Sequence, residues 1–156
     1  MKRVLSIQDI SCIGKCSLTV ALPIISAMGI ETSILPTSIL STHTMFNDFT
    51  FRDLTDDMEP IKKHWQKEGF SFDAIYTGYL GSEKQITLVK DYFKTFGNTC
   101  KYIIVDPAMA DNGKLYSGFD KDFPLKMAKL CKYADVILPN ISEAAFMTGM
   151  PYPGEN

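Results

Sequence analysis

Polar residues follow three short apolar stretches of the chain, and their types suit a phosphate or metal ligand. The three turns begin at Thr77-Gly78-Tyr79, at Asp106-Pro107 and at Pro139-Asn140. Because ligands of an open parallel α/β sheet bind beyond the carboxyl ends of its strands, we expect these turns to meet at one site. Carboxylates together with an asparagine amide indicate a site for Mg²⁺ and phosphate.

Two carboxylates form the first candidate metal site. Asp106 and Asp111 lie five residues apart in a loop after a strand. Mg²⁺ keeps several waters and takes few protein ligands, so such a pair suffices to hold it directly or through water. The alternative is that Asp106-Pro107 only ends the strand in a turn.

A second candidate has the pattern N-x-x-E. Asn140 stands where a strand becomes a helix, and Glu143 falls in the first helical turn. Both side chains are placed to face a hydrated cation. The alternative is a helix-capping arrangement around Ser142.

Two other features are weaker on their own. The turn from Gly78 to Ser82 lets the backbone approach a ligand, and the helix after it presents free N–H groups to an anion. An ordinary strand-to-helix loop explains it equally well. His43, in Ser-Thr-His-Thr, is a candidate base or pocket wall, without the partners of a catalytic triad.

These residues need a scaffold of alternating strands and helices. Ser17 and Ser82 are expected N-caps, the latter in a capping box with Gln85. Pro36 is expected to end a strand, before a long connection over 37–53. We expect strands at 4–8, 30–35, 72–76, 102–105 and 136–138, and helices at 18–28, 55–68, 82–96, 123–133 and 142–147. The alternation predicts a mostly parallel sheet with right-handed crossovers, in which the apolar strand at 102–105 is covered on both faces.

Composition bounds the class of protein. The chain has 156 residues, 46% hydrophobic and 22% charged, which is ordinary for one globular domain. A net charge of −2 gives no reason to expect nucleic acid or membrane as a partner. Cys12 and Cys16 lack the further ligands of a zinc set, so the four cysteines are expected to be reduced thiols of a cytoplasmic protein.

In order and spacing, these motifs resemble the pyridoxal and pyridoxamine kinases of the ribokinase-like superfamily. The resemblance begins at Ser6-Ile7-Gln8 with Gly14, and continues through Ser41-Thr42-His43-Thr44 and Thr77-Gly78-Tyr79-Leu80-Gly81-Ser82. It ends with Asp106-Pro107 and Pro139-Asn140-x-x-Glu143 and covers essentially the whole chain. It implies a three-layer α/β/α fold around a mostly parallel sheet, incomplete at its C-terminal side, with residues 1–156 as the N-terminal part of one kinase domain.

The resemblance also implies an activity and its residues. The activity is ATP-dependent phosphorylation of the 5′-hydroxymethyl group of a B6 vitamer, in pyridoxal 5′-phosphate salvage. The implied substrate pocket consists of Asp9, Cys16, Leu40, Thr44 and Tyr79. The resemblance further places five residues near Mg²⁺ and the ATP phosphates: Asp106, Asp111, Tyr116, Asn140 and Glu143. Of these, Asp106 and Glu143 are implied to lie toward the metal. A homodimer is the expected assembly.

Three departures from the family pattern bear on function. Asp9 stands where many members have Ser, and Leu40 where some have an aromatic residue, so vitamer preference stays open. The family's catalytic aspartate lies in a G-x-G-D motif, which this sequence does not contain. We therefore expect a truncated chain without its own catalytic residue. The alternatives are a hydroxymethylpyrimidine kinase of the same fold and a non-catalytic vitamer-binding fragment.

Overall fold

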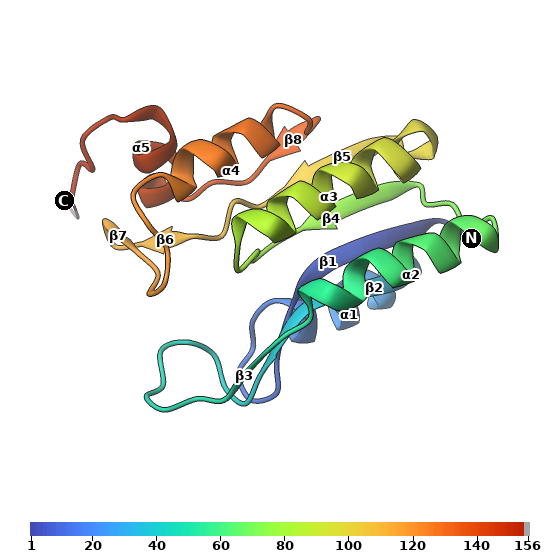
Figure 1. The fold of residues 1–156 in the computed structure, drawn as a ribbon, viewed down its shortest axis with the longest axis horizontal. Coiled ribbons are helices and arrows are strands. Elements are labelled where there is room, and N and C mark those ends of the chain that lie inside the picture. Colours follow the sequence, from blue (N-terminus) through green and yellow to red (C-terminus); the bar gives the residue numbers. More distant parts are fainter. Residues whose placement is uncertain (155–156) are drawn as a thin grey trace.

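A mostly parallel six-stranded sheet forms the centre of the computed structural model, which describes residues 1–154 (Figure 1). Its strand order is β3-β2-β1-β4-β5-β8, and only β3 is antiparallel to its neighbour. These strands are β1 (Arg3–Ser11), β2 (Glu31–Leu40), β3 (Phe51–Asp53), β4 (Ala74–Thr77), β5 (Tyr102–Val105) and β8 (Val136–Ile137). These pairings confirm the predicted mostly parallel sheet.

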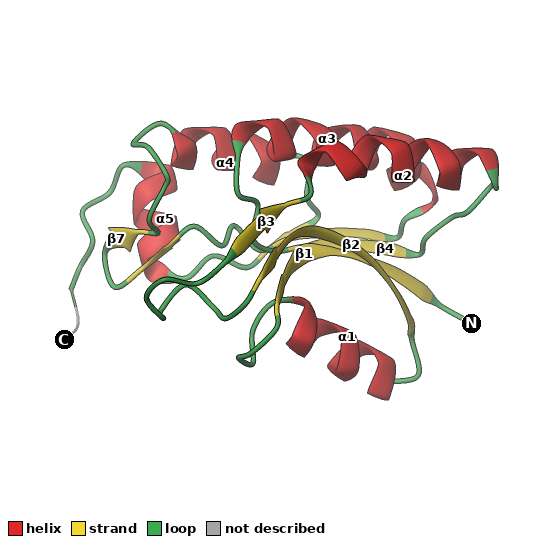
Figure 2. Cartoon of the chain, turned by 60° about the horizontal axis from the view of Figure 1, so that its bottom comes forward, coloured by secondary structure: helices red, strands yellow, loops and turns green. Residues whose placement is uncertain are grey.

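The described residues form five α-helices. They are α1 (Leu18–Ala27), α2 (Thr55–Lys67), α3 (Glu83–Phe96), α4 (Phe123–Cys131) and α5 (Ile141–Thr148), and a 3₁₀ turn, η1 (Gly97–Thr99), follows α3. Figure 2 shows α1 alone on one face of the sheet and α2, α3 and α4 side by side on the other. The main core lies beneath these three helices. On α3 it buries Ile86, Val89, Phe93 and Phe96 at the predicted helical spacing.

One prediction about the sheet is wrong at Pro36. The second strand does not stop there but continues to Leu40, and Pro36 pairs with Gln8. The ladder shifts register between Gln8 and Ile10, immediately beyond this pair. Proline is tolerated at such irregularities because a regular hydrogen bond is not required of it there. The predicted long connection therefore shrinks to the loop 41–50, followed by the short edge strand β3.

A second prediction fails at β5. We expected this strand to be covered on both faces, but Tyr102 is 45% exposed and only Val105 is fully buried. Helix α1 packs mainly against β1 and β2, so it leaves the face of β5 on its side of the sheet largely uncovered. Val136 and Ile137 of the neighbouring edge strand β8 are also exposed. The described part of the chain thus leaves an apolar sheet face open beside α1.

The hairpin formed by β6 (Ala110–Asp111) and β7 (Lys114–Leu115) was not predicted. Its turn is Asn112-Gly113, and both residues have positive φ, 49° and 71°. This is the turn that Asn-Gly favours between antiparallel strands. The hairpin projects at the carboxyl edge of the parallel sheet, at the same end as the loop before β3 (Figure 1).

Candidate functional site

A cavity of about 710 Å³ opens at the carboxyl edge of the sheet. Its walls come from β1, the loop after β1, the end of β2 with the loop 41–50, the turn after β4 and the β6–β7 hairpin. All five residues expected in the substrate pocket line it: Asp9, Cys16, Leu40, Thr44 and Tyr79. Residues as far apart in sequence as Asp9 and Ser117 thus meet where parallel α/β sheets bind their ligands.

Asp9 is the most deeply buried carboxylate that lines this cavity. It is 5% exposed, and Ser11 donates a hydrogen bond from Oγ to its Oδ2 at 3.3 Å. The two side chains share one side of β1 because successive residues of a strand alternate between faces. Burial raises the pKa of the Asp9 carboxyl, and the hydroxyls of Ser17 and Ser11 offset part of that effect.

Tyr79 forms another wall and is fixed by its neighbours. Thr37 donates from Oγ1 to the Tyr79 carbonyl at 3.2 Å, and the Tyr79 ring packs at 5.6 Å against Phe119. The preceding Gly78 has no room for a side chain, since a Cβ there would lie 2.9 Å from Oε1 of Gln8. This close packing sets the direction in which the chain leaves β4 and carries Tyr79 into the cavity.

Gly14 allows the loops after β1 and β2 to touch above the cavity. It has φ of +120°, and a Cβ at this position would lie 2.5 Å from Cδ2 of His43. The His43 ring also packs at 4.8 Å against Phe46, and its Nδ1 accepts a hydrogen bond from the Met45 amide. Because its ring packs against Phe46, its Nδ1 is hydrogen-bonded to the Met45 amide and it lines the cavity, we interpret His43 as a pocket wall.

Asp106 lies in a smaller, adjoining cavity of about 340 Å³ between the sheet edge and α1. The two cavities share several lining residues, among them Cys16, Ser17 and Tyr79. Burial raises the pKa of the Asp106 carboxyl to about 6. Asp111 lines the larger cavity instead, on the exposed side of the hairpin. The two aspartates expected to share a metal therefore face adjacent cavities.

Asn140 and Glu143 form a complete capping box at the start of α5. Asn140 Oδ1 accepts from the Glu143 amide at 2.9 Å, and Glu143 Oε2 accepts from the Asn140 amide at 2.8 Å. The capping alternative is thus realised, with Asn140 as the N-cap rather than Ser142. The second carboxylate oxygen, Oε1, accepts from the Met109 amide at 3.2 Å. Burial raises the pKa of Glu143 to about 7, although hydrogen bonds from the backbone favour its charged form.

The same helix end holds the hairpin. Ser142 accepts a hydrogen bond from the Gly113 amide at 2.8 Å, and Asn140 Nδ2 donates to the Ala110 carbonyl at 2.8 Å. Tyr116 follows the hairpin and lines the larger cavity. Its pKa rises to about 12, chiefly by burial and further by the charges of Glu143, Asp111 and Asp106. Three of the other four residues expected near ATP and metal, Glu143, Asp111 and Asp106, therefore lie close enough to act on Tyr116.

The carboxylates of the site are too few to form a metal centre from protein ligands alone. Within residues 1–154, no group of three His, Cys, Asp or Glu side chains is placed to hold a metal ion. A hydrated Mg²⁺ needs only one or two carboxylates together with substrate phosphates. Asp106 and Glu143 are close enough for the charge of Asp106 to raise the pKa of Glu143. The residues present thus fit a phosphate-bound Mg²⁺ better than a cation held by protein alone.

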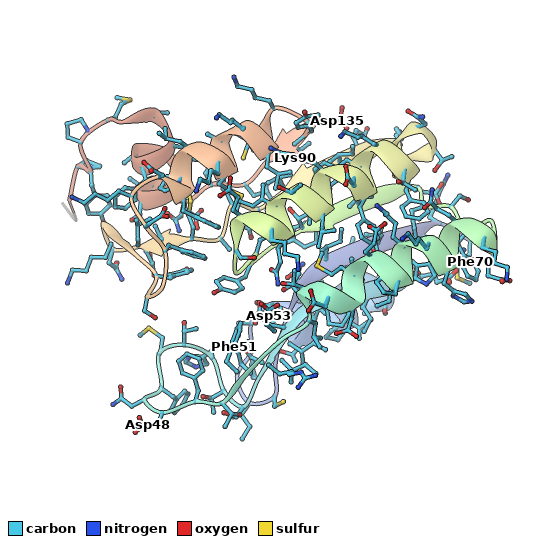
Figure 3. All side chains as sticks on the ribbon, in the orientation of Figure 1. Asp48, Phe51, Asp53, Phe70, Lys90 and Asp135 are labelled. Atoms are coloured by element: carbon cyan, nitrogen blue, oxygen red, sulfur yellow. The ribbon has the colours of Figure 1, made fainter. Side chains whose placement is uncertain are left out.

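Gln85 supports the site in a way that the sequence did not reveal. It was expected to complete a capping box with Ser82, and Ser82 Oγ does accept from the Gln85 amide at 3.2 Å. The Gln85 side chain, however, reaches Gly81 rather than Ser82, accepting from its amide at 2.8 Å. Its Nε2 donates to the Thr37 carbonyl and to Asp53, which Figure 3 shows where β3 meets α2. Gln85 therefore ties the Tyr79 turn to β2 and β3.

Comparisons with known proteins agree with this fold. A crystal structure of pyridoxal kinase from Lactobacillus plantarum is 38% identical, with a TM-score of 0.91, and the match covers 97% of this chain and 54% of that one. A Bacteroides thetaiotaomicron protein, classed provisionally as a phosphomethylpyrimidine kinase and crystallised with pyridoxal, is 44% identical. Its TM-score is 0.95, and the match covers 99% of this chain and 54% of that one. The fold is that of the ribokinase-like kinases.

The family model for phosphomethylpyrimidine kinase matches residues 30–156, so the chain belongs to that family. Among curated proteins, pyridoxal kinase PdxY of Actinobacillus pleuropneumoniae is 28% identical over 159 residues, which is 96% of this chain and 54% of that protein. The chain spans about half the length of the curated relatives it matches. No helix in residues 1–154 is both long and apolar enough to cross a membrane.

Proposed function

We propose that this chain supplies the substrate-binding part of an ATP-dependent kinase that phosphorylates the 5′-hydroxymethyl group of a B6 vitamer, in pyridoxal 5′-phosphate salvage. One observation carries the proposal: the five residues expected in the vitamer pocket line a single cavity. The pyridoxal present with the 44% identical Bacteroides protein supports the same substrate class. Residues 1–156 then form the N-terminal part of one kinase domain.

The phosphate side of the site is proposed to lie around the hairpin and the start of α5. Asp106 and Glu143 would hold Mg²⁺, largely through water, while Asp111, Tyr116 and Asn140 would lie near the ATP phosphates. Mg²⁺ bound there neutralises phosphate charge during phosphoryl transfer. The chain's own part is to position the vitamer and to present carboxylates, because it has no G-x-G-D motif to supply the catalytic aspartate.

The remaining proposals follow the family resemblance. A cytoplasmic homodimer is the proposed setting, consistent with four free cysteines in the structure. A second candidate substrate is a hydroxymethylpyrimidine, which the matching phosphomethylpyrimidine kinase family favours. A vitamer-binding chain without turnover is the remaining alternative.

Binding and turnover, measured on the same preparation, test these alternatives. Calorimetry with pyridoxamine, pyridoxal and hydroxymethylpyrimidine gives the ligand class, and a coupled ADP-release assay with Mg²⁺ and ATP gives the activity. We expect weak binding of a B6 vitamer. Binding of hydroxymethylpyrimidine alone would replace the vitamer proposal with the second candidate. Loss of binding in Tyr79→Ala, but not in Tyr133→Ala on the exposed surface, would place the ligand in the cavity.

A further inference from the structure

The Asp9 carboxylate is only half satisfied by the protein. Oδ2 accepts the Ser11 hydrogen bond, whereas Oδ1 is buried and accepts none from the described residues. Asp9 is 5% exposed and lines the cavity of about 710 Å³. Burying a carboxylate without a partner is costly, and such groups are normally paired or hydrogen-bonded. The Ser17 hydroxyl favours the charged form of this carboxyl but makes no hydrogen bond with Oδ1, so a donor from the cavity would complete the partners of Asp9.

No cation of the described chain compensates Asp9. None of its ion pairs includes this residue. The basic side chains that line the cavity are Lys15 and Lys114, and both are exposed. A ligand that brings a positively charged N–H group would give Oδ1 a charge-assisted hydrogen bond, the stronger kind. A neutral hydroxyl would satisfy it less well.

We propose that Asp9 selects substrates by accepting a hydrogen bond from a cationic N–H group, an inference that rests on the proposed vitamer-binding function. Two groups of a B6 vitamer have this chemistry. One is the protonated ring nitrogen, which all vitamers share. The other is the 4′-aminomethyl group, which only pyridoxamine carries. Ser11 holds the carboxylate from the other side and is a positioning residue, since it donates to Oδ2 and leaves Oδ1 toward the ligand.

The test compares three ligands on three proteins. Pyridoxamine, pyridoxine and 4-deoxypyridoxine are titrated by calorimetry into the 156-residue chain, into Asp9→Asn and into Asp57→Asn. Asn has the shape of Asp without its charge, and Asp57 is an exposed residue of α2 that lines neither cavity. Hydrogen bonds to charged groups predict a weakening of about 10- to 150-fold in Asp9→Asn and none in Asp57→Asn.

The pattern of losses identifies the donor. Weaker binding of all three ligands assigns it to the ring nitrogen, and weaker binding of pyridoxamine alone assigns it to the amine. Equal affinities for wild type and Asp9→Asn would overturn the inference while leaving the proposed function intact. If wild type bound no vitamer at all, both would be overturned together.

A ligand-free measurement checks the same reasoning. If the Asp9 carboxylate serves ligand binding rather than the fold, removing its uncompensated charge should not lower the free energy of unfolding and can raise it. Asp9→Asn should therefore melt at the same temperature as wild type or about 2–4 °C above it. A clearly lower melting temperature would show that the carboxylate serves the fold, which would overturn the inference. Asp9→Ser, which removes the carboxylate and keeps a hydroxyl, provides a second variant for the calorimetric titrations.

Discussion

The buried carboxyl of Glu143 should make the chain less stable as the pH rises. Burial raises its pKa from 4.5 to about 7, so the folded chain holds this proton more tightly than the unfolded chain. The resulting stabilisation is fully present below pH 4.5 and is lost as the pH rises through about 7. Each pKa unit corresponds to about 1.4 kcal/mol, so the contribution amounts to about 3 kcal/mol.

Glu143→Gln isolates this contribution. The glutamine has nearly the same shape and keeps one acceptor oxygen for the two amides of Asn140 and Met109, but it cannot ionise. Urea unfolding of both proteins between pH 4.5 and pH 8 gives the free energy of unfolding at each pH. Relative to the variant, wild type should lose about 3 kcal/mol across this range. Taking the difference removes most of the contribution of Asp106, which titrates in the same direction with a pKa of about 6, and leaves the coupling between the two carboxyls within the measured difference.

Two results would refute the reasoning. Parallel curves for wild type and Glu143→Gln would show that the carboxyl ionises normally in the folded chain. A difference equally large in Asp57→Asn would show that the effect is not specific to the buried site. The same pair of proteins then tests the metal proposal. Mg²⁺ at pH 7.5 should raise the stability of wild type more than that of Glu143→Gln, since it binds the ionised carboxylate. Equal rises would leave Glu143 with its helix-capping role alone.

Three further predictions concern the scaffold and the chain as a whole. Gln85→Ala should lower the free energy of unfolding by about 2–4 kcal/mol, because it leaves several buried polar groups without hydrogen-bond partners. Gln66→Ala, on the exposed side of α2, should change it little. Equal urea midpoints for the two variants would contradict this prediction. Gly14→Ala should weaken vitamer binding at least tenfold by displacing His43, and unchanged calorimetric affinity would show that the loops adapt. The 156-residue chain should self-associate through its open sheet face, and it should release no ADP above background. A chain that is monomeric in light scattering and phosphorylates pyridoxamine would contradict both expectations.

Much of the fold was predictable because it depends on local pattern. The apolar face of α3 and the alternation of strands and helices follow from spacing alone. The extension of β2 beyond Pro36 was not predictable, since it depends on a register shift in its partner strand. The exposure of Tyr102 was not predictable either, because an apolar strand looks the same whether or not a helix covers its second face. The Asn112-Gly113 hairpin had a clear local signal, which its position beside a presumed metal loop obscured.

The site shows a similar division. The residues expected in the vitamer pocket were chosen from motifs that lead to one sheet edge, and the structure brings them together in one cavity. The contact between Ser11 and Asp9 could have been predicted from the sequence, since the two residues lie two positions apart on one strand and share a side of it. The hydrogen bonds of Gln85 join Gly81, Thr37 and Asp53, and no local pattern relates these residues. The choice between capping and metal binding at Glu143 needed the geometry of both carboxylate oxygens.

The attachment of the hairpin to α5 has a consequence for the order in which the chain acquires its parts during synthesis. The strands β1, β2, β4 and β5, with α2 and α3, are complete once residue 105 has emerged. The wall of the cavity that includes Lys114 and Tyr116 is held by Asn140 and Ser142, which emerge some thirty residues later. A nascent chain halted before Asn140 would therefore have its main core but only one side of its binding cavity, so ligand recognition would begin only after α5 has formed.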